Sequence, residues 1–139
     1  MSSRLVTFTL AERSYGIEVD AVQEVLRGLP RTRIPLAPRA LAGLINLRGQ
    51  VLTAIDLRAQ FGLPDRDEGV EPMLVVIRVS GEPIALLVDS IGAVVDVEDS
   101  WFEAPPETLT GVARELIRGA YKLPGRLLHA LDVDRAVAA

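Results

Sequence analysis

The residue types that carry out acid–base or metal chemistry in proteins are scarce in this sequence. His129 is the only histidine, and the 139 residues include no cysteine. His129 lies in the alternating stretch GRLLHALDV, which is typical of a strand, and this position favours a packed or surface histidine over a catalytic base. A zinc site needs clustered His and Cys ligands, and phosphate binding needs a glycine-rich loop; neither pattern occurs. The sequence therefore predicts a protein that is not an enzyme and holds no metal or cofactor.

Carboxylates are more numerous, but their spacing favours structural roles. Asp56 and Asp132 end two similar strands, where a turn or backbone contact explains both better than acid–base chemistry. The stretch PDRDEGVE, residues 64–71, resembles a calcium-binding loop faintly. Counted from Asp65, the first possible ligand, its glycine comes at the fifth position rather than the sixth, and a third ligand is missing. We therefore interpret this stretch as a solvated linker.

Charged residues are distributed unevenly along the chain, whose net charge is −4. Five arginines and no carboxylate lie between Glu24 and Asp56, whereas seven acids and no base lie between Arg78 and Arg114. This segregation fits either ordinary solvated surfaces or a basic and an acidic face that address different partners. The acid excess and the small number of aromatic residues argue against nucleic-acid binding.

The N-terminal stretch MSSRLVTFTL lacks the features of a signal peptide. No apolar run approaches the roughly 20 residues that a membrane-spanning helix needs. Together with the absence of cysteine, this predicts a cytoplasmic protein without direct membrane insertion.

Short segments rich in Val, Ile, Leu and Thr, separated by Gly, Pro or charged turns, predict an all-β fold. Helix signals are limited to one or two short turns, one through AVQEVL after Asp20 and one in TLTGVARELI. The expected strands are RLVTFTL, RSYGIEV, GQVLTAIDL, PMLVVIRV, PIALLVD, GAVVDV and GRLLHALDV.

An internal repeat organises these strands. A shift of 69 positions aligns residues 8–26 with 77–95, and a shift of 76 aligns 43–57 with 119–133. The repeat predicts two similar units of about five strands, each suited to a small closed barrel. We place the first at about residues 1–66 and the second at about 67–139, with a break in FGLPDRDEGVEP; exchange of the N-terminal strand between the units stays open.

The bend Asn-Leu-Arg-Gly, residues 46–49, carries more than the repeat requires. Its second copy keeps the glycine, but Asn46 becomes Lys122 and Arg48 becomes Pro124. A connecting bend needs its glycine but neither the amide nor the guanidinium. Asn46 then serves either its own turn or a partner, and Arg48 is either a solvated charge, a partner for Asp56, or a binding residue.

The stretches YGIEVDAVQEVL, GLINLRGQVLTAIDLRAQFGL and ALLVDSIGAVVDV resemble the CheW family of chemotaxis coupling proteins. The combination of N-L-R-G with a following D-L-R is the hallmark of this family, and the similarity extends from about Leu5 to Val137. The resemblance implies a single CheW-like domain over residues 1–139, made of two five-stranded SH3-like β-barrels packed side by side.

The resemblance also implies an adaptor that couples the cytoplasmic tip of a methyl-accepting chemoreceptor to the regulatory domain of a CheA-type histidine kinase, at membrane-associated receptor arrays. Val22 and Glu24 match the kinase-binding positions. Receptor binding is implied for Asn46, Arg48 and Gly49, flanked by Gly43 and Val51. A guanidinium at a bend suits this role because its planar fork binds carboxylates in pairs of hydrogen bonds.

Two alternatives remain at this level. Besides the chemotaxis adaptor, the chain could be a coupling module of a non-flagellar pathway, such as one for surface motility or development, or a small β-barrel that binds peptides outside chemotaxis.

Overall fold

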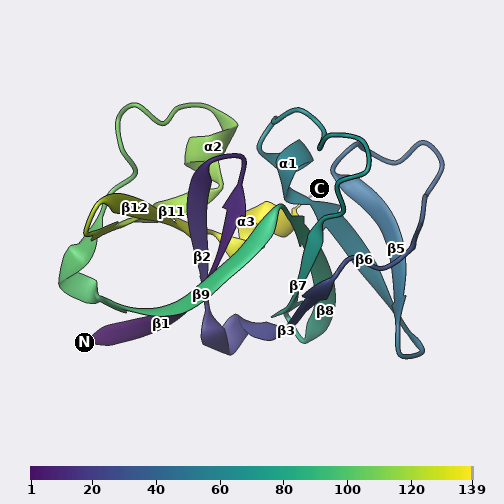
Figure 1. Cartoon of the computed structure of the whole chain (residues 1–139), viewed down its shortest axis with the longest axis horizontal. Helices are drawn as coiled ribbons and strands as arrows, with labels where there is room; N and C mark the ends of the chain where they lie inside the picture. The colour runs from purple at the N-terminus through teal and green to yellow at the C-terminus, as the bar shows by residue number, and fades with distance from the viewer. Residues whose placement is uncertain (139) are drawn as a thin grey trace.

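The structure, a computed structural model, describes residues 1–138, which form two six-stranded sheets in two adjacent lobes (Figure 1). Sheet 1 has the order β10-β11-β12-β2-β1-β9, and sheet 2 has the order β3-β7-β8-β6-β5-β4. The strands of sheet 1 are β1 (Ser2–Leu10), β2 (Arg13–Glu18), β9 (Ser90–Glu98), β10 (Phe102–Glu103), β11 (Ile117–Leu123) and β12 (Arg126–Leu131). The strands of sheet 2 are β3 (Val22–Arg27), β4 (Arg31–Thr32), β5 (Leu41–Leu47), β6 (Gln50–Asp56), β7 (Met73–Val79) and β8 (Glu82–Val88).

The prediction of an all-β protein made of two SH3-like units is confirmed, although each sheet has six strands because a two-residue strand, β4 or β10, extends one edge. The expected helical turn through AVQEVL is wrong, because Ala21 ends a 3-10 turn and residues 22–26 belong to β3, which pairs with β7. Short helices in the described part of the chain are α1 (Leu57–Gln60), α2 (Val112–Glu115) and α3 (Val133–Val137), with 3-10 turns at Val19–Ala21 and Asp99–Trp101.

The repeat is visible in the topology. A shift of 76 positions places β5 on β11 and β6 on β12, and it places α1 on α3. Each sheet nevertheless takes its first hairpin from the other half of the chain: β1–β2 pair with β9 and β12, whereas β7–β8 pair with β3 and β6. The sheets therefore comprise residues 2–18 with 90–131, and 22–88, rather than the two halves of the sequence.

The parallel pairs explain this exchange. Strand β2 runs parallel to β12, and β6 runs parallel to β8, so neither pair can be joined by a tight hairpin turn. Instead β2 continues through the turn Val19–Ala21 directly into β3 of the other sheet. The chain thus passes from sheet 1 to sheet 2 and back again, which fixes the two lobes to each other.

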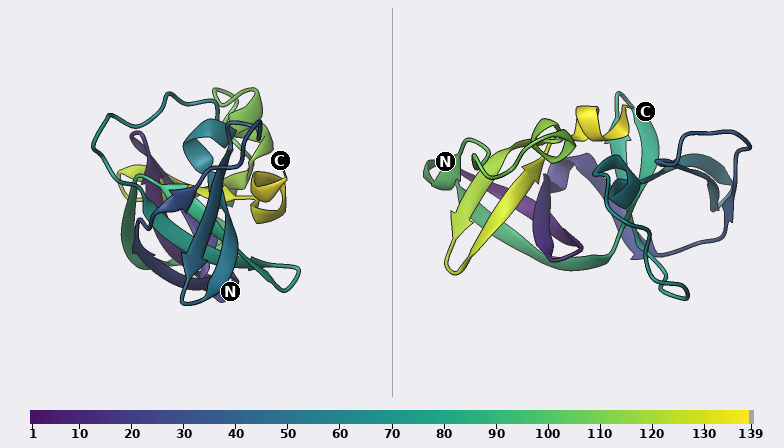
Figure 2. Two further views of the ribbon diagram at one scale, coloured as in Figure 1. Left: turned by 90° about the vertical axis from the view of Figure 1, so that its right-hand side faces the viewer. Right: turned by 90° about the horizontal axis from the view of Figure 1, so that it is seen from above.

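A shared core lies between the lobes. Phe8, Leu10 and Tyr15 of sheet 1 pack in one buried cluster with residues of sheet 2 such as Val75 and Leu86. Helices α1 and α3 meet at the same junction (Figure 2). There the Gln60 side-chain amide donates a hydrogen bond to the Ala136 carbonyl at 2.6 Å. Each lobe also has a smaller cluster of its own.

Ion pairs reinforce the junction where β8 leaves sheet 2. The Asp89 carboxylate accepts two hydrogen bonds from Arg58, both at 2.8 Å, and one from the Ala11 N–H at 2.7 Å. Burial alone would raise the pKa of Asp89, but the Arg58 and Ala11 hydrogen bonds and the nearby Arg66 charge hold it below its ordinary value. Asp56 caps α1 through the Arg58 N–H and accepts two hydrogen bonds from Arg66 at 3.1 Å.

Candidate functional site

The β5–β6 bend is a tight two-residue turn. Leu47 pairs with Gln50, which leaves Arg48 and Gly49 as the loop, with φ angles of 50° and 86°. Positive φ at both central residues defines a type I′ turn, whose twist suits a hairpin. The Asn46 side-chain oxygen accepts a hydrogen bond from the Gly49 N–H at 2.9 Å. Asn46 therefore stabilises its own turn and holds Arg48 at the tip.

The Arg48 guanidinium forms an ion pair with Glu24 of β3. Strand β3 is one edge of sheet 2, whereas the β5–β6 hairpin lies towards the opposite edge. This pair consequently bridges the two sides of the barrel, and it is open to solvent: the Arg48 side chain is 67% exposed and that of Glu24 is 28% exposed. Arg48 does not pair with Asp56, which forms its ion pair with Arg66 instead. The structure thus brings together one residue from each of the two expected binding sets.

Apolar residues around this corner differ in how far they reach solvent. Val22 is half-buried and packs on the core between the lobes, whereas Val25 of the same strand is 43% exposed. On the hairpin, Val51 is 61% exposed and pairs directly across the strands with Asn46. We define the β3–hairpin corner as Glu24, Val25, Asn46, Arg48 and Val51. Val25 was missing from the expected site, although the alternation of its strand could have indicated it.

Gly43 lies at the other end of β5 and is buried. Its φ is 134°, and a Cβ atom there would lie 2.3 Å from the carbonyl oxygen of Thr32 in β4. Glycine at this position allows β4 to lie against β5. Gly49, in contrast, is exposed at the bend beside Arg48.

The remaining chemistry of the described residues is limited. His129 is buried to 8% exposure, with its Nδ1 atom 3.0 Å from the Ser14 carbonyl oxygen and its ring packed on Tyr15. Among residues 1–138, no three His, Cys, Asp or Glu side chains gather as metal ligands would. Within the same range, no helix has the length and apolar character needed to span a membrane.

Comparison with known proteins decides the family. Residues 4–139 match the CheW-like domain. The chain belongs to the CheW family. The chemotaxis protein CheW of Treponema pallidum is 30% identical over 136 residues, which cover 95% of this chain and 80% of that protein. The chemotaxis protein CheW of Rhizobium meliloti is 28% identical over 130 residues, covering 94% and 84% of the two proteins.

A solved structure supports the same assignment. The scaffolding protein TtCheW from Thermoanaerobacter tengcongensis aligns with a TM-score of 0.89 and 27% sequence identity, covering 100% of this chain and 94% of that one. The CheW family membership that the N-L-R-G and D-L-R stretches indicated is therefore confirmed. In this member of the family, Arg48 of the first stretch pairs with Glu24, and Arg58 of the second pairs with Asp89.

Proposed function

We propose that this CheW-family protein is a non-catalytic chemotaxis scaffold that couples the cytoplasmic tip of a chemoreceptor to a histidine kinase. The names of its relatives, chemotaxis protein CheW and scaffolding protein TtCheW, support a scaffold role. The observation that carries the proposal is the ion pair of the β3–hairpin corner, which is open to solvent, together with the exposed side chains of Val51 on the hairpin and Val25 on β3. A protein interface of this kind gains affinity from the apolar residues and orientation from the charges.

The two expected partners use different sides of the corner. The kinase regulatory domain binds β3 through Glu24 and Val25, and the receptor tip binds the hairpin through Asn46, Arg48 and Val51. Because Arg48 pairs with Glu24 in the free protein, the ion pair joins the two surfaces. Gly43 and Val22 act from the interior, by placing β4 and β3, rather than by touching a partner.

Charge reversal at the ion pair tests this division. The variants are Arg48→Glu, Glu24→Arg, and the two changes together, each measured by calorimetry against the kinase regulatory domain and by pull-down with receptor cytoplasmic fragments. Each single change should weaken its assigned partner about tenfold, as loss of a charged hydrogen bond does. The double change restores the ion pair inside the chain. We expect it to leave receptor capture weak, because receptor carboxylates then face Glu at position 48.

Controls separate binding from folding. Val22→Asp places a carboxylate against the core, so it is unsuitable for measuring an interface; Val25→Asp is the matched exposed change. The wild-type chain, mixed with receptor fragments and kinase, should raise kinase autophosphorylation. Failure of this activation, with all three proteins folded, would refute the coupling function itself, whereas full recovery by the double change would refute direct receptor contact by Arg48.

A further inference from the structure

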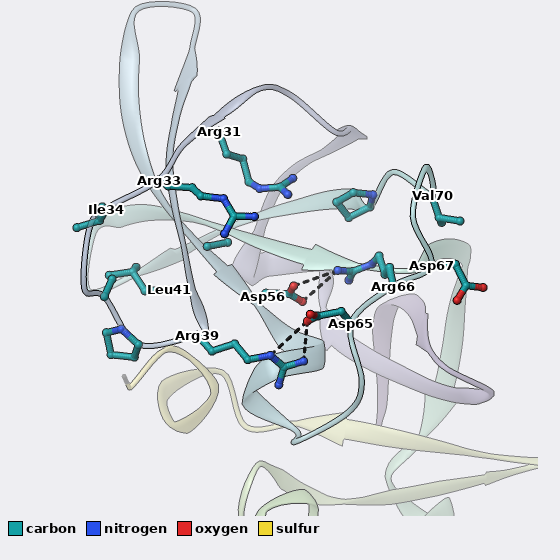
Figure 3. A pocket seen from close by; sticks show the side chains of 14 residues that line it. Arg31, Arg33, Ile34, Arg39, Leu41, Asp56, Asp65, Arg66, Asp67 and Val70 are labelled. Atoms are coloured by element: carbon teal, nitrogen blue, oxygen red, sulfur yellow. Dashed lines mark hydrogen bonds and ion pairs between the residues drawn. The ribbon is translucent and has the colours of Figure 1, made fainter.

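A cleft of about 400 Å³ opens beside β4 and the first residues of β5 in sheet 2 (Figure 3). It lies between the loop that carries β4 and the linker that precedes β7. We call it the arginine cleft, because its lining includes Arg31, Arg33, Arg39 and Arg66. The cleft borders the first residues of β5, whereas Arg48 follows the last one. At about 3.3 Å per residue, Leu41 at the far side of the cleft lies roughly 20 Å along β5 from the bend, whereas Arg31, which pairs with Ile45, lies roughly 10 Å from it.

The arginines of the cleft differ in how they are paired. Arg39 forms an ion pair with Asp65 at 2.7 Å, and Arg66 forms one with Asp56 at 3.1 Å. Arg31 and Arg33 form no side-chain hydrogen bond or ion pair with any described residue, 1–138. Their guanidinium groups both point into the cleft (Figure 3). Two cations are thus left to an outside anion.

Arg66 adds a further unmet donor. Its side chain is only 9% exposed, yet its Nη2 atom has no hydrogen-bond partner among the described residues. Its Nε atom lies 3.0 Å from an Asp89 oxygen but outside hydrogen-bonding geometry. A guanidinium carries five donors, and buried donors without partners are uncommon in folded proteins. Both atoms are themselves buried, so Arg66 adds positive charge to the wall of the cleft, and Arg31 and Arg33 supply the donors that an outside anion can reach.

Apolar residues at the rim identify the kind of anion. Ile34 is 36% exposed and Val70 is 55% exposed, and they lie on opposite sides of the cleft (Figure 3). Leu36, between Pro35 and Pro38, is fully exposed with a φ of 62°. Free phosphate gains nothing from these apolar side chains. A nucleic acid carries a charge at every phosphate and would bring several of them against Asp56, Asp65 and Asp67 in the same lining, whereas a peptide can place a single carboxylate between Arg31 and Arg33. An acidic peptide with apolar side chains complements both features.

We propose that the arginine cleft binds an acidic peptide segment of a protein partner, with a carboxylate held between Arg31 and Arg33 and an apolar side chain against Ile34 or Val70. This is a second interaction surface, and it does not rest on the coupling function assigned to the β3–hairpin corner. It gives the basic segment between Glu24 and Asp56 a second binding partner.

The test uses the full chain and a short fluorescein-labelled peptide in which glutamate and leucine alternate. Fluorescence anisotropy should show saturable binding that the double variant Arg31→Gln with Arg33→Gln weakens about tenfold or more. Arg126→Gln, a change at an exposed arginine of the β11–β12 hairpin, is the matched control and should leave binding unchanged. Amide chemical shifts should move at Arg31, Arg33 and Val70 when the peptide is added.

Several outcomes would overturn the proposal. Equal loss in the Arg126→Gln control would reduce it to nonspecific charge attraction. Equal binding of a peptide with lysine in place of glutamate would exclude charge recognition, and competition by inorganic phosphate at similar concentrations would identify a small-anion site instead. Absence of saturable binding, or shift changes confined to the Arg48 hairpin, would also refute it. Because Arg31 and Arg33 are exposed, we expect their substitution to leave the fold intact. Thermal unfolding of each variant checks this.

Discussion

The hairpins β5–β6 and β11–β12 occupy equivalent places in the two sheets, yet their bends differ. Arg48 and Gly49 both have positive φ, whereas the second bend has Pro124 before Gly125, whose φ is 76°. Proline fixes φ near −65°, so the second bend cannot be a type I′ turn and instead suits type II. Both turns close a hairpin, and only the glycine is common to them. The fold therefore does not require Arg48.

The ion pair of the first bend is also missing from the second half. The 69-residue shift aligns Glu24 with Ala93, and the 76-residue shift aligns Arg48 with Pro124. Sheet 1 forms without this pair, so closure of such a barrel does not depend on it. A residue pair that one copy keeps and the other lacks, on an exposed surface, is better explained by a partner than by folding.

Residues that both halves share at equivalent positions have structural roles instead. Gly43 and Gly119 are equivalent, and a Cβ atom would lie 2.3 Å from the Thr32 carbonyl oxygen at the first and 2.4 Å from the Glu103 carbonyl oxygen at the second. In both cases the close neighbour is the two-residue edge strand, β4 or β10. Asp56 and Asp132 likewise each accept a hydrogen bond from the backbone at the start of a short helix. These residues serve the fold.

The largest effect is expected at the shared glycines. Gly43→Ala and Gly119→Ala should each lower the free energy of unfolding by about 3 kcal/mol or more, because the methyl group collides with backbone and the edge strand must separate. Urea unfolding followed by circular dichroism measures this. Gly49→Ala is the control: no atom lies within 4 Å of its Cβ position, so only the positive φ costs energy, about 1 kcal/mol. Equal effects at Gly43 and Gly49 would contradict the steric explanation.

The parts of the fold that the internal repeat covers could be predicted from the sequence. The repeat and the apolar alternation predicted most strands of the fold, because each depends on neighbouring residues. The sequence was insufficient for the exchange of the first hairpins, since β1–β2 and β7–β8 have similar apolar patterns and fit either sheet. The ion pair between Glu24 and Arg48 joins residues 24 positions apart, and local patterns do not encode such distant contacts.

The candidate site was predictable only in part for a related reason. Along β3, Val22, Glu24 and Leu26 alternate with Gln23, Val25 and Arg27, so each face of the strand carries both polar and apolar residues. Pairing with β7 decides which set is covered. The role of Arg66 could not be predicted for the same reason. The linker around it has the sequence of a solvated turn, and only the fold brings Arg66 against Asp56 and Asp89.

A second comparison of equivalent residues predicts an intermediate effect. Asp89 is held by Arg58 and Arg66, whereas Asp20, its counterpart under the 69-residue shift, is exposed and has no ion pair among residues 1–138. Asp89→Asn should lower the free energy of unfolding by about 2 kcal/mol at pH 7, because it leaves two largely buried guanidinium groups short of a counter-charge. Asp20→Asn should change it by less than about 0.5 kcal/mol. Urea titrations of the two variants measure the difference.

The pH dependence of this effect follows from the lowered pKa of Asp89. A carboxyl group whose pKa is lower in the folded chain stabilises the fold above its unfolded pKa of about 3.9, and the stabilisation is lost as pH falls through the folded value. The difference between wild type and Asp89→Asn should therefore be full at neutral pH and shrink below about pH 4. A difference that stays constant down to pH 2 would show that Asp89 acts by packing rather than by charge.

The smallest effect on stability is expected at the bend that carries the proposed function. The Arg48–Glu24 pair is largely open to solvent, as is the Lys122–Glu103 pair of the second half. Exposed ion pairs contribute about 0–1 kcal/mol, so Arg48→Ala and Lys122→Ala should shift urea midpoints by similar, small amounts. Only Arg48→Ala should reduce receptor capture and kinase activation. Large destabilisation by Arg48→Ala alone would instead make the pair a structural clamp of sheet 2, and loss of binding would then follow from loss of the barrel rather than from a missing contact.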